Sequence, residues 1–74
     1  MYKVIGCSVT YPEGKPVFSC IVVSEASKAH LSLIIPLSRA KTKEDIKHYI
    51  AEQLEVSYSE VAWREGLEIP QTGS

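Results

Sequence analysis

The sequence predicts an α+β fold: a small antiparallel sheet with one amphipathic helix on one face, in the order βββα(β). Two β-rich stretches flank a turn with proline and glycine, a third stretch alternates in polarity, and a later segment has apolar residues at helical spacing. With 74 residues, the chain has room for one domain, which we expect over residues 1–69, with a flexible tail over residues 70–74.

The first two strands are expected to form a hairpin around the turn Pro12–Lys15. Centring the loop on Glu13 and Gly14 fixes which residues face each other. One sheet face then carries the apolar pairs Ile5/Val22, Cys7/Cys20, Val9/Phe18 and Tyr11/Pro16. The other face carries Val4/Val23, Gly6/Ile21, Ser8/Ser19 and Thr10/Val17. A slip of one residue would mix the two sets, so burial of the apolar face fixes the register.

A third strand is predicted over residues 29–37, where two sets of residues alternate. One set is Leu31, Leu33, Ile35 and Leu37, and the other is His30, Ser32, Ile34 and Pro36. Because Pro36 has no N–H for a strand ladder, it marks a strand end or an edge strand. A meander of three strands places this strand at an edge, in agreement with Pro36.

The helix is predicted over residues 43–55, with Thr42 as its N-terminal cap. Glu44 and Asp45 in the first turn complement the positive end of the helix dipole. Helical spacing assigns to the buried side Ile46, Tyr49, Ile50, Gln53 and Leu54. The outward side then carries Lys47, His48, Ala51, Glu52 and Glu55.

The C-terminal part of the chain has two competing patterns. Val61, Trp63, Leu67 and Ile69 follow a period of two, which indicates a fourth strand over residues 61–69. Alternatively, Ser57–Glu60 fits a capping box and Gly66 would end a short helix after it. We favour the strand, because a helix would leave Trp63 without a place on its apolar side.

Catalysis, cofactor binding and metal binding are not expected. The possible metal ligands Cys7, Cys20, His30 and His48 have no ligand spacing within one element. The glycines are scattered rather than grouped in a phosphate-binding loop, and so short a chain has little volume for a concave site. With two cysteines and no apolar run long enough to span a membrane, we expect a cytoplasmic protein.

The two cysteines face each other in the expected hairpin. Cys7 and Cys20 would be within reach of a disulfide, which would make them a redox-sensitive link. They could equally be two small buried hydrophobic residues, as free cysteines often are. We favour the second interpretation, because neither a CxxC motif nor a basic neighbour activates a thiol here.

A basic cluster at the start of the helix is the basis of one functional hypothesis. It consists of Arg39, Lys41, Lys43 and Lys47. Cations beside a helix N-terminus can bind anions, including the phosphates of a nucleic acid. The intervening Glu44 and Asp45 and the net charge of −1 argue against this, so nucleic-acid binding is the alternative function.

The second sheet face is the basis of the favoured hypothesis. It is half apolar, with no charged residue at the strand centres, and the helix can cover only the first face. Exposed apolar patches of this kind mark protein contacts, unless the C-terminal residues fold over them. The expected protein-binding residues are Val4, Ile21, Val23, Ile34 and Trp63. We therefore expect a small non-catalytic regulator or inhibitor that occludes another protein's surface, alone or as a homodimer. Short proteins of this composition are common among the accessory genes of phages and mobile elements.

Overall fold

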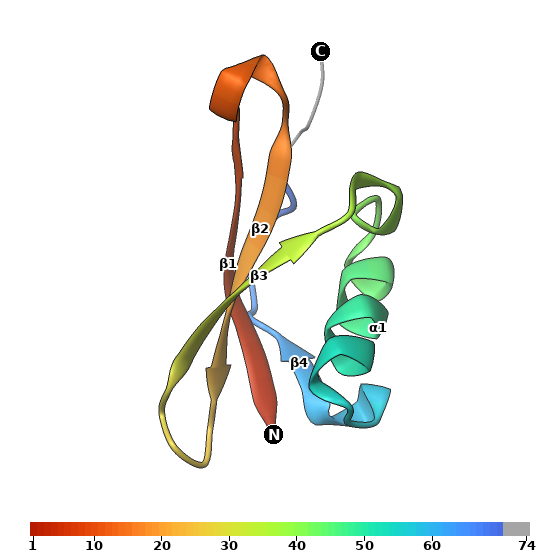
Figure 1. Ribbon diagram of the computed structural model, residues 1–74. Helices are drawn as coiled ribbons and strands as arrows, with labels where there is room; N and C mark the ends of the chain where they lie inside the picture. The colour runs from red at the N-terminus through yellow and green to blue at the C-terminus, as the bar shows by residue number, and fades with distance from the viewer. Residues whose placement is uncertain (71–74) are drawn as a thin grey trace.

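The computed structural model describes residues 1–70 and confirms the α+β fold (Figure 1). The strands and the helix are β1 (Tyr2–Thr10), β2 (Val17–Ser24), β3 (His30–Ile35), α1 (Lys43–Leu54) and β4 (Val61–Trp63). Short 3-10 turns lie at Pro12–Gly14, Leu37–Arg39 and Tyr58–Glu60. The strand order is β3-β2-β1-β4, so β3 lies at an edge as predicted. Because β4 runs parallel to β1, the sheet is mixed rather than wholly antiparallel.

The β1–β2 hairpin has the predicted register over only part of its length. From Gly6 to Thr10 the pairing is as expected, but it shifts between Val4 and Gly6. An extra residue in one strand is a β-bulge, and beyond it the strand presents the opposite set of side chains to each face. Val4 therefore pairs with Val22 instead of Val23. The expected position of Val4 on the second face is wrong, because its side chain is fully buried in the core.

The helix begins at Lys43 as predicted and ends at Leu54, one residue earlier than predicted. The Thr42 hydroxyl accepts a hydrogen bond from the Asp45 backbone N–H at 3.1 Å, which satisfies an otherwise unpaired donor of the first turn. Glu55 ends the helix in the left-handed conformation with φ 57°. The buried side contains Ile46 and Ile50 as expected, but Ala51, expected on the outward side, is buried, and Gln53, expected on the buried side, is exposed. Ala51 belongs to the same buried cluster as Val61 of β4. The spacing of apolar residues along the helix does not show where β4 lies, so it could not predict that Ala51 is buried.

The core lies between α1 and one face of the sheet (Figure 1). Its buried residues are Val4, Phe18, Cys20, Val22, Ile35, Ala40, Ile46, Ile50, Ala51 and Val61. Five of these residues lie on β1, β2 or β3, and all five side chains point toward the helix. Within one strand they are alternate residues, which share a face of the sheet. This single cluster holds the sheet, the helix and β4 together.

The C-terminal segment packs against the same core. The predicted strand over residues 61–69 is confirmed only for Val61–Trp63. A turn follows, in which Gly66 has φ 84° and the Leu67 N–H donates to the Arg64 carbonyl at 3.1 Å. Of the alternative, a short helix after a capping box at Ser57–Glu60, only the 3-10 turn Tyr58–Glu60 forms. Of the expected tail, Pro70 is partly buried, and residues 71–74 lie outside the described residues.

Two matched isoleucine substitutions test the position of the core. Ile50 is fully buried, whereas Ile34 is 69% exposed. We expect Ile50→Val to lower the free energy of unfolding by about 1 kcal/mol, because it removes one buried methylene group, and Ile34→Val to change it little. Urea denaturation of both variants measures the difference. Equal losses would contradict the assignment of the two faces.

Candidate interaction surface

The sheet side opposite α1, which we call the open face, is built by three strands. Its residues are Lys3, Gly6, Ser8 and Thr10 on β1, Val17, Ser19, Ile21 and Val23 on β2, and His30, Ser32 and Ile34 on β3. These residues alternate with the buried ones, so their side chains point away from the helix. Serine, threonine and branched apolar side chains predominate. Such a composition is more apolar than a sheet face in contact with water usually has.

Two isoleucines are the largest exposed apolar side chains on the open face. Ile21 is 44% exposed and Ile34 is 69% exposed. Ile21 is paired with Ser32, so Ile34 lies diagonally across from it, about 7–8 Å away for such positions. A side chain added at Gly6, the partner of Ile21 on β1, would meet nothing within 4 Å. Ile21 therefore lies between a neighbouring isoleucine and open space.

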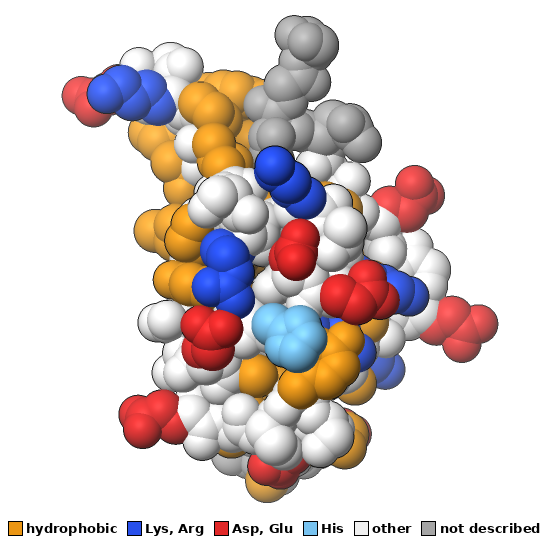
Figure 2. Space-filling view, turned by 90° about the vertical axis from the view of Figure 1, so that its right-hand side faces the viewer, with side chains coloured by type: hydrophobic (Ala, Val, Ile, Leu, Met, Phe, Trp, Pro, Cys, Tyr) orange, Lys and Arg blue, Asp and Glu red, His pale blue; other side chains and the backbone are white. Residues whose placement is uncertain are grey.

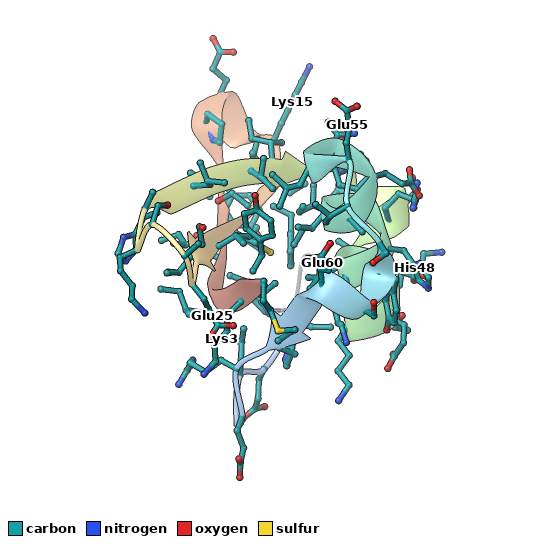
Figure 3. The ribbon with its side chains drawn as sticks, turned by 90° about the horizontal axis from the view of Figure 1, so that it is seen from below. Lys3, Lys15, Glu25, His48, Glu55 and Glu60 are labelled. Atoms are coloured by element: carbon teal, nitrogen blue, oxygen red, sulfur yellow. The ribbon has the colours of Figure 1, made fainter. Side chains whose placement is uncertain are left out.

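Basic groups lie at one side of the open face. Along the described strands, Lys3 is the only residue of this face with a permanent charge. Arg64, directly after β4, donates from Nε to the carbonyl of Ile5 at 2.9 Å, beside the bulge. Figure 3 shows Lys3 and Glu25 together, on the opposite side of the molecule from His48 of α1. The open face is thus apolar at β2 and β3 and basic toward β4.

The expected binding residues divide between the two sides of the sheet. Ile21, Val23 and Ile34 share the open face, where Val23 is partly buried between Lys3 and His30. Val4 and Trp63 are paired neighbours and share the opposite, covered side.

Trp63 is held within the fold. It packs against the core, and its indole Nε1 donates to the Leu67 carbonyl at 2.9 Å. The expectation that Trp63 belongs to the exposed surface is wrong. Its position depends on β4 pairing parallel with β1, which brings Trp63 beside Val4. The remaining apolar candidates for an exposed site are therefore Ile21, Val23 and Ile34.

The C-terminal residues do not cover the two exposed isoleucines within residues 1–70. Leu67 and Ile69 pack against the core cluster on the helix side, together with Trp63. Because α1 reaches only part of that side, this segment covers apolar surface that the helix leaves free (Figure 1). Ile21 and Ile34 keep the exposure given above.

Contacts within the fold occupy two of the four basic residues that the sequence analysis grouped as a basic cluster, Arg39 and Lys47. Arg39 Nη2 lies 2.7 Å from Glu52 Oε2, and Arg39 also lies over the ring of Tyr49. Lys47 Nζ lies 4.6 Å from the ring centre of Tyr58, a cation–π contact. Figure 2 shows acidic and basic side chains mixed over the helix side of the molecule. Of the four basic residues, Lys41 and Lys43 are the exposed ones, beside Glu44 and Asp45.

The Arg39–Glu52 pair shifts the titration of both groups. The hydrogen bond from Arg39 lowers the pKa of Glu52 from its ordinary value, and the same bond raises the pKa of Arg39. The sequence placed Glu52 on a solvated helix face but contained no signal that Arg39, thirteen positions earlier, would contact it. The structure places Arg39 beside the second half of α1, where Tyr49 and Glu52 lie, rather than at its first turn.

Other kinds of site find little support in the described residues. No three His, Cys, Asp or Glu side chains within residues 1–70 are grouped so that they could hold a metal ion. None of the described helices has the length and apolar character needed to span a bilayer. Comparison with protein-family models, curated proteins and solved structures found no match.

The Arg39–Glu52 pair can be tested by titration. We expect Arg39→Gln to raise the pKa of Glu52 toward its ordinary value, because the substitution removes the cation that stabilises the carboxylate. Since the folded-state pKa is the lowered one, the pair stabilises the fold at neutral pH and loses this contribution as the pH falls through that pKa. NMR titration of the Glu52 side-chain carboxyl measures the shift. Lys41→Gln is the control and should leave the pKa of Glu52 unchanged.

Proposed function

We propose that this chain is a small, non-catalytic protein-binding regulator that acts by occluding the surface of another protein. The observation that carries this proposal is the exposure of Ile21 and Ile34 on a sheet face with few charges. Burying one such side chain stabilises a complex by roughly 1.5–3 kcal/mol when it starts fully exposed. A partner that covers both isoleucines thus gains enough free energy to compensate part of the entropy lost on association.

The shape and charge of the open face define the partner it would accept. The space beside Gly6 admits an apolar side chain of the partner next to Ile21. Lys3 and Arg64 would favour a partner with acidic residues beside that apolar segment. Charges at the rim of an interface mainly increase the association rate and select the orientation. The edge strand β3 offers backbone groups on its free side for an additional strand.

A different protein fits these features better than a second copy of the chain. Two copies joined face to face would bring two sets of basic groups to one interface. The strands themselves contribute no acidic residue to the open face, and Glu25, which directly follows β2 and lies beside Lys3 (Figure 3), compensates only part of this charge. We therefore propose a heterologous partner, and self-association is an outcome that the experiment distinguishes.

The experiment compares open-face variants with helix variants. Wild type, Ile21→Asp and Ile34→Asp are used to capture proteins from an extract of the source cells, and a captured protein is purified for direct titration. We expect each substitution to weaken binding at least about tenfold, because a charge is buried without a partner. The control is the double variant Lys41→Glu/Lys43→Glu, which should bind like wild type. Circular dichroism checks that every variant is folded.

Three outcomes would contradict the proposal. Binding of the purified protein that Ile34→Asp leaves intact would exclude the open face. Binding to nucleic acid that falls steeply with salt and is lost in Lys41→Glu/Lys43→Glu would instead assign function to the basic cluster. A mass that doubles with concentration, and does so for wild type but not for Ile34→Asp, would show that a second copy occupies the face.

A further inference from the structure

Two thiols lie in contact across the hairpin. Cys7 of β1 and Cys20 of β2 are direct register partners. Their Sγ atoms are 2.7 Å apart, and both cysteines are free thiols. Directly opposed residues of an antiparallel pair have the Cα separation that a disulfide requires. The backbone therefore needs no rearrangement to accommodate a covalent bond between the two sulfur atoms.

We propose that Cys7 and Cys20 are a thiol oxidation site that forms a reversible disulfide across the β1–β2 hairpin. The site lies on the covered side of the sheet, opposite Ile21 and Ile34, so the proposal does not depend on the proposed function. The partner molecule would be a low-molecular-weight disulfide such as oxidised glutathione. The sequence raised such a link as an alternative, and the contact between the sulfur atoms now supports it.

The two cysteines differ in accessibility and in acidity. Cys20 is buried, whereas Cys7 is partly exposed, so an external oxidant reaches Cys7 first. The hydrogen bond between the thiols lowers the pKa of Cys7 and raises that of Cys20, while burial acts to raise both. The thiolate is the nucleophile in disulfide exchange, so Cys7 is the attacking residue. Cys20 is then the resolving residue.

The exchange takes place in two balanced steps. The Cys7 thiolate attacks one sulfur of oxidised glutathione, the S–S bond of glutathione breaks, and one glutathione thiolate leaves. Cys20 then loses its proton and attacks the Cys7 sulfur of the mixed disulfide, which releases the second glutathione. Two cysteine thiols are oxidised to one disulfide, and one glutathione disulfide is reduced to two thiols.

The disulfide would close residues 7–20 into a ring that contains the hairpin turn. The turn end of this ring projects beyond α1 (Figure 1), whereas Phe18 and Cys20 of the same ring are buried in the core. A covalent link restricts the unfolded chain and so stabilises the fold. For a domain of this size we expect the midpoint of thermal unfolding to rise by on the order of 10 °C on oxidation.

Mass spectrometry of wild type and single variants tests the order of attack. After incubation with oxidised glutathione, wild type should lose the mass of two hydrogen atoms. Cleavage by a glutamate-specific protease after Glu13 should leave the Cys7 and Cys20 peptides linked. Cys20→Ser should retain one glutathione on Cys7, and Cys7→Ser should react at least about tenfold more slowly, since its remaining thiol is the buried one. The same incubation in urea is the matched control and should favour glutathione adducts over the internal link.

The thermal midpoint tests the effect of the link. It should rise on oxidation of wild type, return with a reductant, and stay unchanged in Cys7→Ser/Cys20→Ser. Wild type that yields only glutathione adducts, covalent dimers or unreacted thiols would overturn the proposed site. Because these measurements use the wild-type chain, they remain decisive even where a serine variant fails to fold. A linked hairpin with an unchanged midpoint would overturn the proposed stabilisation.

Discussion

A helix of twelve residues is about 18 Å long, whereas the longest dimension of the molecule is 36 Å. The helix α1 therefore covers only part of one sheet face. The segment after β4 covers more of that face, through Trp63, Leu67 and Ile69. Because the helix and this segment pack on the same side, the isoleucines of the opposite side remain exposed. The division of the sheet into a covered and an open face determines where the core lies and which apolar side chains stay exposed.

The β-bulge near Ile5 shows where sequence patterns stop being informative. Hydrophobic alternation predicted the register from Gly6 to Thr10 correctly, because one face there is apolar and the other polar. At Val4 and Ile5 both residues are apolar and β-branched, so the pattern fits either face. In the structure Val4 pairs with Trp63, a residue far away in the sequence, and both side chains lie on the covered side. By contrast the helix and its Thr42 cap depend on neighbouring residues, and both were predicted correctly.

The residues of the candidate interaction surface also fall into two groups: those that the sequence assigned to the correct face and those that it did not. Ile21, Val23 and Ile34 lie on strands whose register is fixed by the hairpin and the meander, so the sequence assigned them to the correct face. Val4 and Trp63 depend on β4, whose period-two pattern predicted a longer strand but contained no signal for its parallel pairing with β1. For the basic cluster, the sequence contained the charges but not the contacts that occupy them, such as that between Arg39 and Glu52. Short-range order was predictable, whereas contacts between distant segments were not.

The strand β2 connects the two proposals physically. Its alternating residues place Phe18, Cys20 and Val22 in the core and Ile21 and Val23 on the open face. A bond between Cys20 and Cys7 would restrict the backbone directly before Ile21 without altering any side chain of the open face. Binding costs less entropy when the contacting residues are already held in place. The covalent state of the covered face would thus change how rigidly the open face presents Ile21, because one strand contributes to both.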